Sequence, residues 1–140
     1  MKKNIIKKLL VTAAFSSLLV IGESLPAYAS LSDSTSETIG GVTVSASIST
    51  DIMGATAETS CPRVASVSAN ATAYYWWGSD YYQTSSYSSV SGGTTVTTAV
   101  KKRGGADVVG GKGVHYVGFN NSHWDPTTIV GITPSNAISE

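Results

Sequence analysis

Residues 65–77 read A-S-V-S-A-N-A-T-A-Y-Y-W-W, and apolar and polar side chains alternate along most of this stretch. In an extended strand a period of two puts one set of side chains on each face. One face carries Ala65, Val67, Ala69, Ala71, Ala73, Tyr75 and Trp77, and the other carries Ser66, Ser68, Asn70, Thr72, Tyr74 and Trp76. The pattern predicts a long strand whose alanine-rich face packs closely against a second sheet or a helix.

The strand ends in four aromatic residues, followed by a turn signal at 78–80 and by further tyrosines. Aromatic rings can stack on sugar rings, and they also suit a protein partner or a membrane interface. We predict a ligand-binding surface, with the outward Tyr74 and Trp76 as the first contacts. Its residues are Tyr74, Trp76, Trp77, Tyr81, Tyr82 and Trp124. In the alternative interpretation these rings only close the core, and a slip of one residue would exchange the two faces.

Residues 1–29 have the three parts of a secretory signal peptide in order. Four lysines open the segment, an apolar run covers residues 9–21, and the small residues Ala27 and Ala29 mark a cleavage site. The run is shorter than the roughly 20 residues that a membrane span requires. We therefore expect a protein secreted into the medium, in the style of bacterial export, with no membrane span.

Charge excludes some function classes. The chain has 9 basic and 9 acidic residues, and cleavage would remove four lysines and Glu23, which leaves 5 basic and 8 acidic residues. A net charge of −3 on the mature chain argues against nucleic-acid binding and against cationic membrane-active peptides. The remaining length of about 111 residues fits one domain.

The rest of the mature chain is rich in the residue types of strands and turns. We expect a disordered Ser/Thr-rich leader at 30–41, a β-domain at 42–134 and a frayed C-terminus at 135–140. Within the domain we expect strands at 42–49, 63–77, 81–91, 94–101, 114–119 and 127–132. Five or six strands at this spacing predict a small antiparallel β-sandwich or barrel-like meander.

Two segments between these strands lack alternation. Residues 51–62 favour a short helical turn or an irregular connection, because Gly54 and Pro62 limit any helix. Residues 102–113 contain five glycines and are predicted to form a mobile connection; they lack the spacing of a phosphate-binding loop. The dipeptide Gly92-Gly93 is predicted to form a tight hairpin turn between two strands.

Few residues have side chains suited to metal binding or catalysis. His115, His123, Asp107 and Asp125 lie within one short region, but their spacing matches no close metal-ligand motif, so we predict no metal and no cofactor. Lys101, Lys102, Arg103 and Lys112 form a local basic cluster, which we expect to protect a strand edge. Cys61 is the only cysteine, and we expect an inert thiol in a monomer, with a disulfide dimer through Cys61 as the alternative.

Without a catalytic motif, the sequence favours a non-enzymatic binding protein that engages a cell-surface polymer, such as a glycan, or another extracellular ligand through its strand-end aromatics. A second hypothesis is a secreted, bacteriocin-like antimicrobial toxin, which the small size and exported Gly/Ser/Tyr-rich composition permit. A third is a self-associating extracellular matrix protein, since long uncharged strands can pair edge to edge. A small hydrolase comes last, because catalytic triads are defined in space rather than in sequence.

Overall fold

The computed structural model describes residues 30–140, which form eight β-strands and no helix. The strands are β1 (Leu31–Ile39), β2 (Val42–Thr50), β3 (Gly54–Trp77), β4 (Asp80–Lys101), β5 (Asp107–Phe119), β6 (Ser122–Trp124), β7 (Thr127–Gly131) and β8 (Ile138–Ser139). The all-β prediction is confirmed, with more strands than expected. The predicted signal peptide at 1–29 lies outside the described residues.

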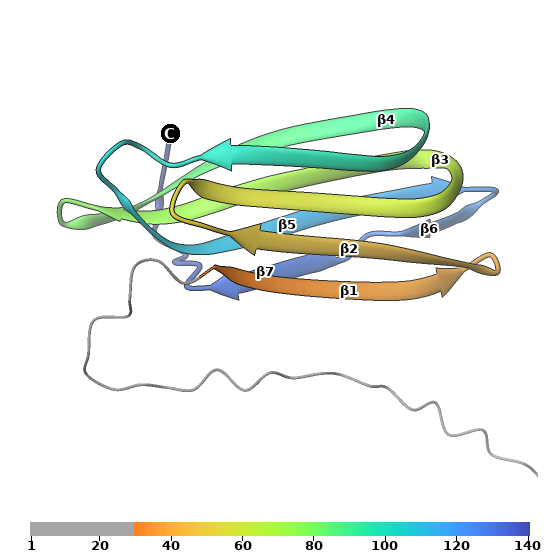
Figure 1. Ribbon diagram of the computed structural model, residues 1–140, viewed down its shortest axis with the longest axis horizontal. Helices are drawn as coiled ribbons and strands as arrows, with labels where there is room; N and C mark the ends of the chain where they lie inside the picture. The colour runs from red at the N-terminus through yellow and green to blue at the C-terminus, as the bar shows by residue number, and fades with distance from the viewer. Residues whose placement is uncertain (1–29) are drawn as a thin grey trace, which may run out of the picture.

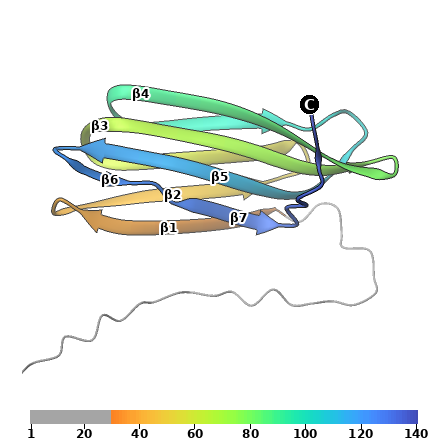
Figure 2. The same ribbon diagram turned by 180° about the vertical axis from the view of Figure 1, so that it is seen from behind.

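Strand β3 changes its neighbour halfway along its length. Residues 55–60 pair with β2, whereas residues 66–76 pair with β5. The register breaks between Ser60 and Ala65, around Pro62, which has no N–H to give to a sheet ladder. On its other side β3 pairs with β4 through both halves, so the two strands form one long bent hairpin. Figures 1 and 2 show this hairpin folding back on itself at the end of the molecule opposite its tip.

The bent hairpin creates two layers. The first layer contains β1, β2, the first half of β3 and the second half of β4; the second layer contains the other halves of β3 and β4 with β5, β6, β7 and β8. All pairings are antiparallel except that of β4 with the two-residue β8. The fold is therefore a single open sheet folded into a sandwich (Figure 1).

Two sequence predictions about connections are wrong. Gly92-Gly93 does not reverse the chain: Gly92 has a φ of 81°, but β4 continues through the pair and bends with β3. The three strands predicted at 63–77, 81–91 and 94–101 are therefore one hairpin of two long strands. Residues 54–62, predicted to be helical or irregular, belong to β3, because their backbone pairs with β2 and β4.

Three further segments contradict the sequence-based boundaries. The predicted disordered leader contains β1, which pairs with β2 along its whole length despite its exposed polar side chains, because the ladder uses backbone groups. The glycine-rich connection is half strand, since β5 begins at Asp107. The predicted frayed end contains β8, whose residues pair with Tyr82 and Gln83.

The alanine row of residues 65–77 lies in the core, as the alternation predicts. Ala69, Ala71, Ala73 and Tyr75 are fully buried, and the polar residues between them lie on the outer face of the second layer. Facing them, the first layer buries the small side chains of Ala46, Ala55 and Ala57 beside the larger Val44 and Ile48. Small residues on both sides let the layers approach closely.

Gly111 on β5 shows how close this approach is. A Cβ atom at Gly111 would lie 2.6 Å from Cγ2 of Thr50 and 3.5 Å from Cβ of Ala55, both of which belong to the opposite layer. Real Cβ atoms do not approach other atoms so closely, so the layers would have to separate locally. Gly111, one glycine of the predicted connection, is therefore needed for the close packing of the two layers.

This packing yields a stability prediction. Gly111→Ala is expected to lower the free energy of unfolding by about 1–3 kcal/mol through overpacking, measured by urea denaturation. Gly104→Ala is the matched control, because a Cβ there meets nothing within 4 Å. The control is expected to stay within about 0.5 kcal/mol of the unsubstituted protein. Equal stability of the two variants would contradict the close approach.

Candidate functional site

The outer face of the second layer carries an open groove of about 600 Å³. Strands β3, β4 and β5 form its floor, and the last two residues of the chain border one end. Its floor includes Ser68, Asn70, Thr72 and Tyr74 of β3, Gln83, Ser85 and Tyr87 of β4, and Lys112, Val114 and Tyr116 of β5. We call this surface the outer groove.

Sheet register fixes the order of side chains in the outer groove. Asn70 of the central strand lies between Val114 and Tyr87, and Thr72 lies between Lys112 and Ser85. Tyr116 lies beside Ser68, next to the row of Asn70. Aromatic and aliphatic groups therefore collect at one end, while hydroxyl, amide and ammonium groups line the middle.

The two tyrosines at this end are accessible. Tyr87 on β4 is 61% exposed, and Tyr116 on β5 is 40% exposed. Hydrogen bonds from Ser89 first, and then from Ser68, lower the pKa of Tyr87, because hydroxyl donors favour the phenolate. Exposed rings held beside polar groups are typical of a binding surface.

A second aromatic group lies at the tip of the β3–β4 hairpin. Trp76 and Tyr81 meet edge to face with ring centroids 4.7 Å apart, and Trp77 and Tyr82 do so at 5.9 Å. On the Trp77 side, the guanidinium of Arg103 lies 4.2 Å above the indole ring. The aromatic rings at the tip therefore pack against one another across the two strands, with one pair on each face of the hairpin.

The C-terminus holds this tip against the sheet. Arg103 pairs with the Glu140 carboxylate at 2.8 Å, and the same carboxylate accepts a hydrogen bond from the buried Tyr75 hydroxyl. Burial raises the pKa of Tyr75 to about 12, and the Glu140 carboxylate adds to the effect. Gln83 also holds residues 138–140, which we call the tail, since its backbone carbonyl accepts a hydrogen bond from the Glu140 N–H at 3.0 Å.

The six predicted binding residues do not form one surface. Trp76, Trp77, Tyr81 and Tyr82 gather at the hairpin tip. Tyr74 points to the outer face as predicted but is only 7% exposed, which leaves Trp76 as the accessible member of the outward pair. Trp124 pairs with Val117 at the other end of β5 and joins the core, so the structure separates it from the rest.

The outer groove contains residues that are not among the six predicted binding residues. Tyr87, Tyr116, Asn70 and Lys112 are all outward on their strands. The signal was present for Tyr87, which alternates with serine and glutamine along residues 83–89. Tyr116 and Lys112 could not be grouped with it, because only the pairing of β5 with β3 brings them together.

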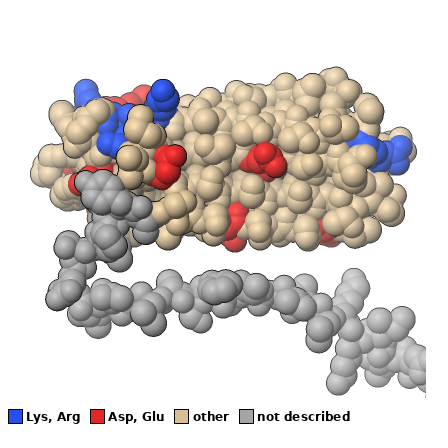
Figure 3. Space-filling model, viewed as in Figure 1, with Lys and Arg blue, Asp and Glu red and all other residues tan. Residues whose placement is uncertain are grey.

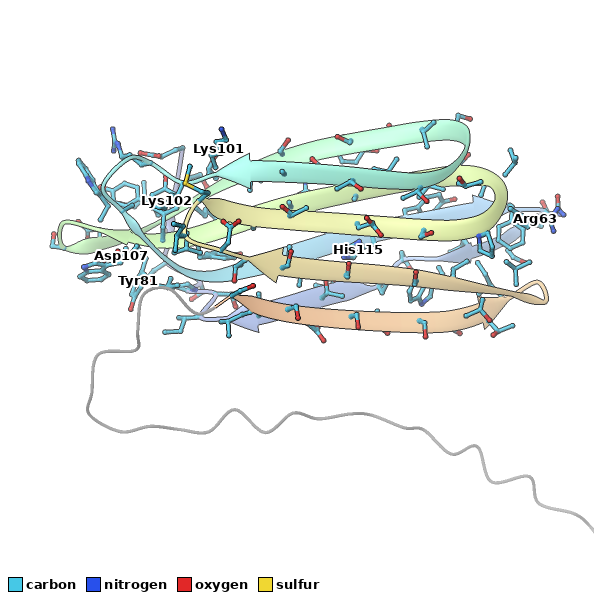
Figure 4. The ribbon with its side chains drawn as sticks, in the orientation of Figure 1. Arg63, Tyr81, Lys101, Lys102, Asp107 and His115 are labelled. Atoms are coloured by element: carbon cyan, nitrogen blue, oxygen red, sulfur yellow. The ribbon has the colours of Figure 1, made fainter. Side chains whose placement is uncertain are left out.

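The four residues of the predicted basic cluster also lie in two separate places. Figure 3 shows a group of basic side chains at one end of the molecule, and Figure 4 places Lys101 and Lys102 there. Lys102 donates to the carbonyl of Ala106, and Arg103 is paired with Glu140. Lys112 lies apart, in the outer groove.

His115 is on β5 and is buried in the interior between the two layers. Figure 4 labels its position near the middle of the molecule. Thr59 of the first half of β3 donates its hydroxyl proton to the Ser68 carbonyl at 2.8 Å, so its oxygen accepts from His115 Nδ1, also at 2.8 Å. His115 Nε2 then accepts from the Thr128 hydroxyl at 2.8 Å. This pattern assigns a neutral ring with its proton on Nδ1. The buried Thr59–His115–Thr128 network joins the first layer to β5 and β7.

Within residues 30–140, no three His, Cys, Asp or Glu side chains gather in a way that could hold a metal ion. Cys61 is free and fully buried, so its thiol has no access to a second chain in this fold. None of the elements described in the structure is a helix long and apolar enough to cross a membrane.

The chain matches no model of a known protein family, and no curated protein or solved structure is significantly similar to it. The site must therefore be interpreted from its own residues.

The His115 network predicts an acid-sensitive stability. Burial lowers the pKa of His115 from its usual 6.5, because the interior disfavours the imidazolium ion. Below pH 6.5 the unfolded chain binds a proton that the folded chain resists, so the free energy of unfolding is expected to fall as pH falls from 6.5 through the lowered folded-state pKa. Urea denaturation across pH 4–8 measures this slope.

His115→Gln removes the titrating group and is expected to remove this part of the slope, even if the variant is less stable at pH 7. An unchanged slope in the variant would show that carboxylates alone produce it. If the variant does not fold, an NMR titration of the His115 ring in the unsubstituted protein gives the folded-state pKa directly, and a value at or above 6.5 would contradict the prediction.

Proposed function

We propose that this protein is a secreted, non-enzymatic binding protein that engages an extracellular glycan through the outer groove. The observation that carries the proposal is the pairing of two exposed tyrosines with hydroxyl and amide side chains on one open face. Sugar rings present C–H faces that stack on aromatic rings and hydroxyl edges that need hydrogen-bond partners.

The arrangement of the groove suits an extended chain better than a small compact ligand. Its floor follows β3, and the distance along this strand from Asn70 to Trp76 is about 20 Å at the usual rise per residue. Tyr87 and Tyr116 supply stacking surfaces at one end, and the outward Trp76 lies beyond the other end. A linear polymer could contact all three rings while its hydroxyls bond to the serine, threonine and asparagine side chains between them.

Charge supports a neutral or weakly charged ligand. Three charged side chains border the groove: the positive Lys112 and the negative Asp125 and Glu140. This mixture offers no strong field of one sign, which binding of a highly charged polymer such as nucleic acid would require.

The proposal predicts losses of affinity for the two tyrosine variants. Tyr87→Ala and Tyr116→Ala are each expected to weaken binding to purified peptidoglycan or to a glycan-array ligand by about tenfold, or about 1.4 kcal/mol. Trp76→Ala tests the far contact. Val64→Ala is the control, since Val64 is 65% exposed at the bend and outside the groove. Equal binding by all variants, or no binding to any polymer, would overturn the proposal.

A further inference from the structure

The free edge of β4 is the least protected part of the fold. Beyond β3, the only described segment that pairs with β4 is β8, at Tyr82 and Gln83. Residues 81–100 of this strand contain no Asp, Glu, Lys, Arg or Pro. Exposed edge strands normally carry such residues, because unpaired backbone groups otherwise accept a strand from another chain.

The opposite side of the sandwich is protected. There β1 of the first layer lies against β7 of the second, and the Asp33 carboxylate accepts a hydrogen bond from the Ile129 backbone N–H at 3.2 Å. Asp33 and Glu37 also place charges on β1. In Figure 3 acidic side chains lie over the middle and lower part of the molecule and beside the lysine cluster, while the rest of the upper edge carries no charged side chain.

The backbone direction at the free edge can be derived from β8. The Gln83 carbonyl accepts from the Glu140 N–H, so the backbone polar groups of Gln83 point away from β3. Successive residues of a strand alternate in this respect, and the pairing of residues 80–91 with β3 contains no irregularity. Ser85, Tyr87 and Ser89 therefore also direct their N–H and C=O groups to the open edge. The pairing of β8 with Tyr82 and Gln83 shows that this edge of β4 accepts an added strand.

We propose that the edge of β4 at residues 85–89 binds the same edge of a second copy of this chain in an antiparallel two-stranded ladder. A two-fold axis at Tyr87 places Ser85 opposite the partner's Ser89 and Tyr87 opposite the partner's Tyr87. All these positions have edge-directed backbone groups, so each facing pair exchanges two hydrogen bonds. The absence of charge from this edge means that no like charges meet at the axis.

The pairing has consequences for the whole molecule. An axis perpendicular to the sheet joins the two second layers into one continuous sheet, with both outer grooves on the same side and the two Tyr87 rings adjacent. The contact is closed, because each copy uses the same edge once, so it gives a dimer and not a fibre. It replaces the monomer that the sequence favours, and it stands on backbone geometry without relying on the proposed ligand.

The test uses a pair of double variants that differ in backbone N–H groups. S85P/S89P removes two edge-directed donors that make no bond within the chain, whereas S85A/S89A removes the same hydroxyls and keeps the donors. Sedimentation over about 1 μM to 1 mM is expected to show a monomer–dimer equilibrium for the unsubstituted protein and for S85A/S89A. The proline variant is expected to bind itself at least tenfold more weakly.

A monomer at every concentration, growth beyond a dimer, or equal association of both double variants would overturn the proposal. If S85P/S89P does not fold, amide hydrogen exchange of the unsubstituted protein decides. Exchange at Ser85, Tyr87 and Ser89 is expected to slow at least tenfold between the lowest and highest concentrations. Exchange that is independent of concentration would refute the pairing.

Discussion

The two layers lie so close together that a threonine of one shares its hydroxyl with a histidine of the other. Only small side chains permit this distance, and they come from both layers: the alanines of β3, the alanine of β2 and the glycines of β5. Gly113 serves a different need within the second layer, because a Cβ there would lie 2.4 Å from His115 Nε2 and 2.6 Å from the Thr128 hydroxyl. Besides its larger apolar side chains, this core depends on close contact between small residues and on hydrogen bonding of its few buried polar groups.

The bent hairpin explains how a broad polar face of the domain comes to point outward. Because β3 and β4 pass from one layer to the other, they supply one central strand and one edge strand to each layer without a crossover connection. Their polar faces then point outward, and in the second layer β5 adds a third strand with Tyr116 and Lys112 beside them. The outer groove is thus a consequence of the same alternation that buries the alanines.

The hairpin also determines which edges remain open. Its β3 strand has neighbours on both sides, whereas β4 has β3 on one side and little more than the tail on the other. The other side of the sandwich is closed by the contact of β1 with β7, with Asp33 capping a backbone group. The molecule therefore has one protected side and one side from which protective charges are absent.

The sequence by itself determined the all-β class and the two faces of residues 65–77, because a period of two over this stretch allows one backbone conformation and two distinct sides. It predicted the burial of the alanines and the outward direction of Trp76. It could not determine partners: the bends at Pro62 and Gly92, the entry of Gly111 and Gly113 into β5, and the pairing of β1 depend on backbone hydrogen bonds between distant segments. For the same reason the tertiary structure alone brought Tyr116 and Lys112 beside Tyr87, enclosed His115 between two threonines and moved Trp124 into the core, since contacts across a sheet follow register and not distance along the chain.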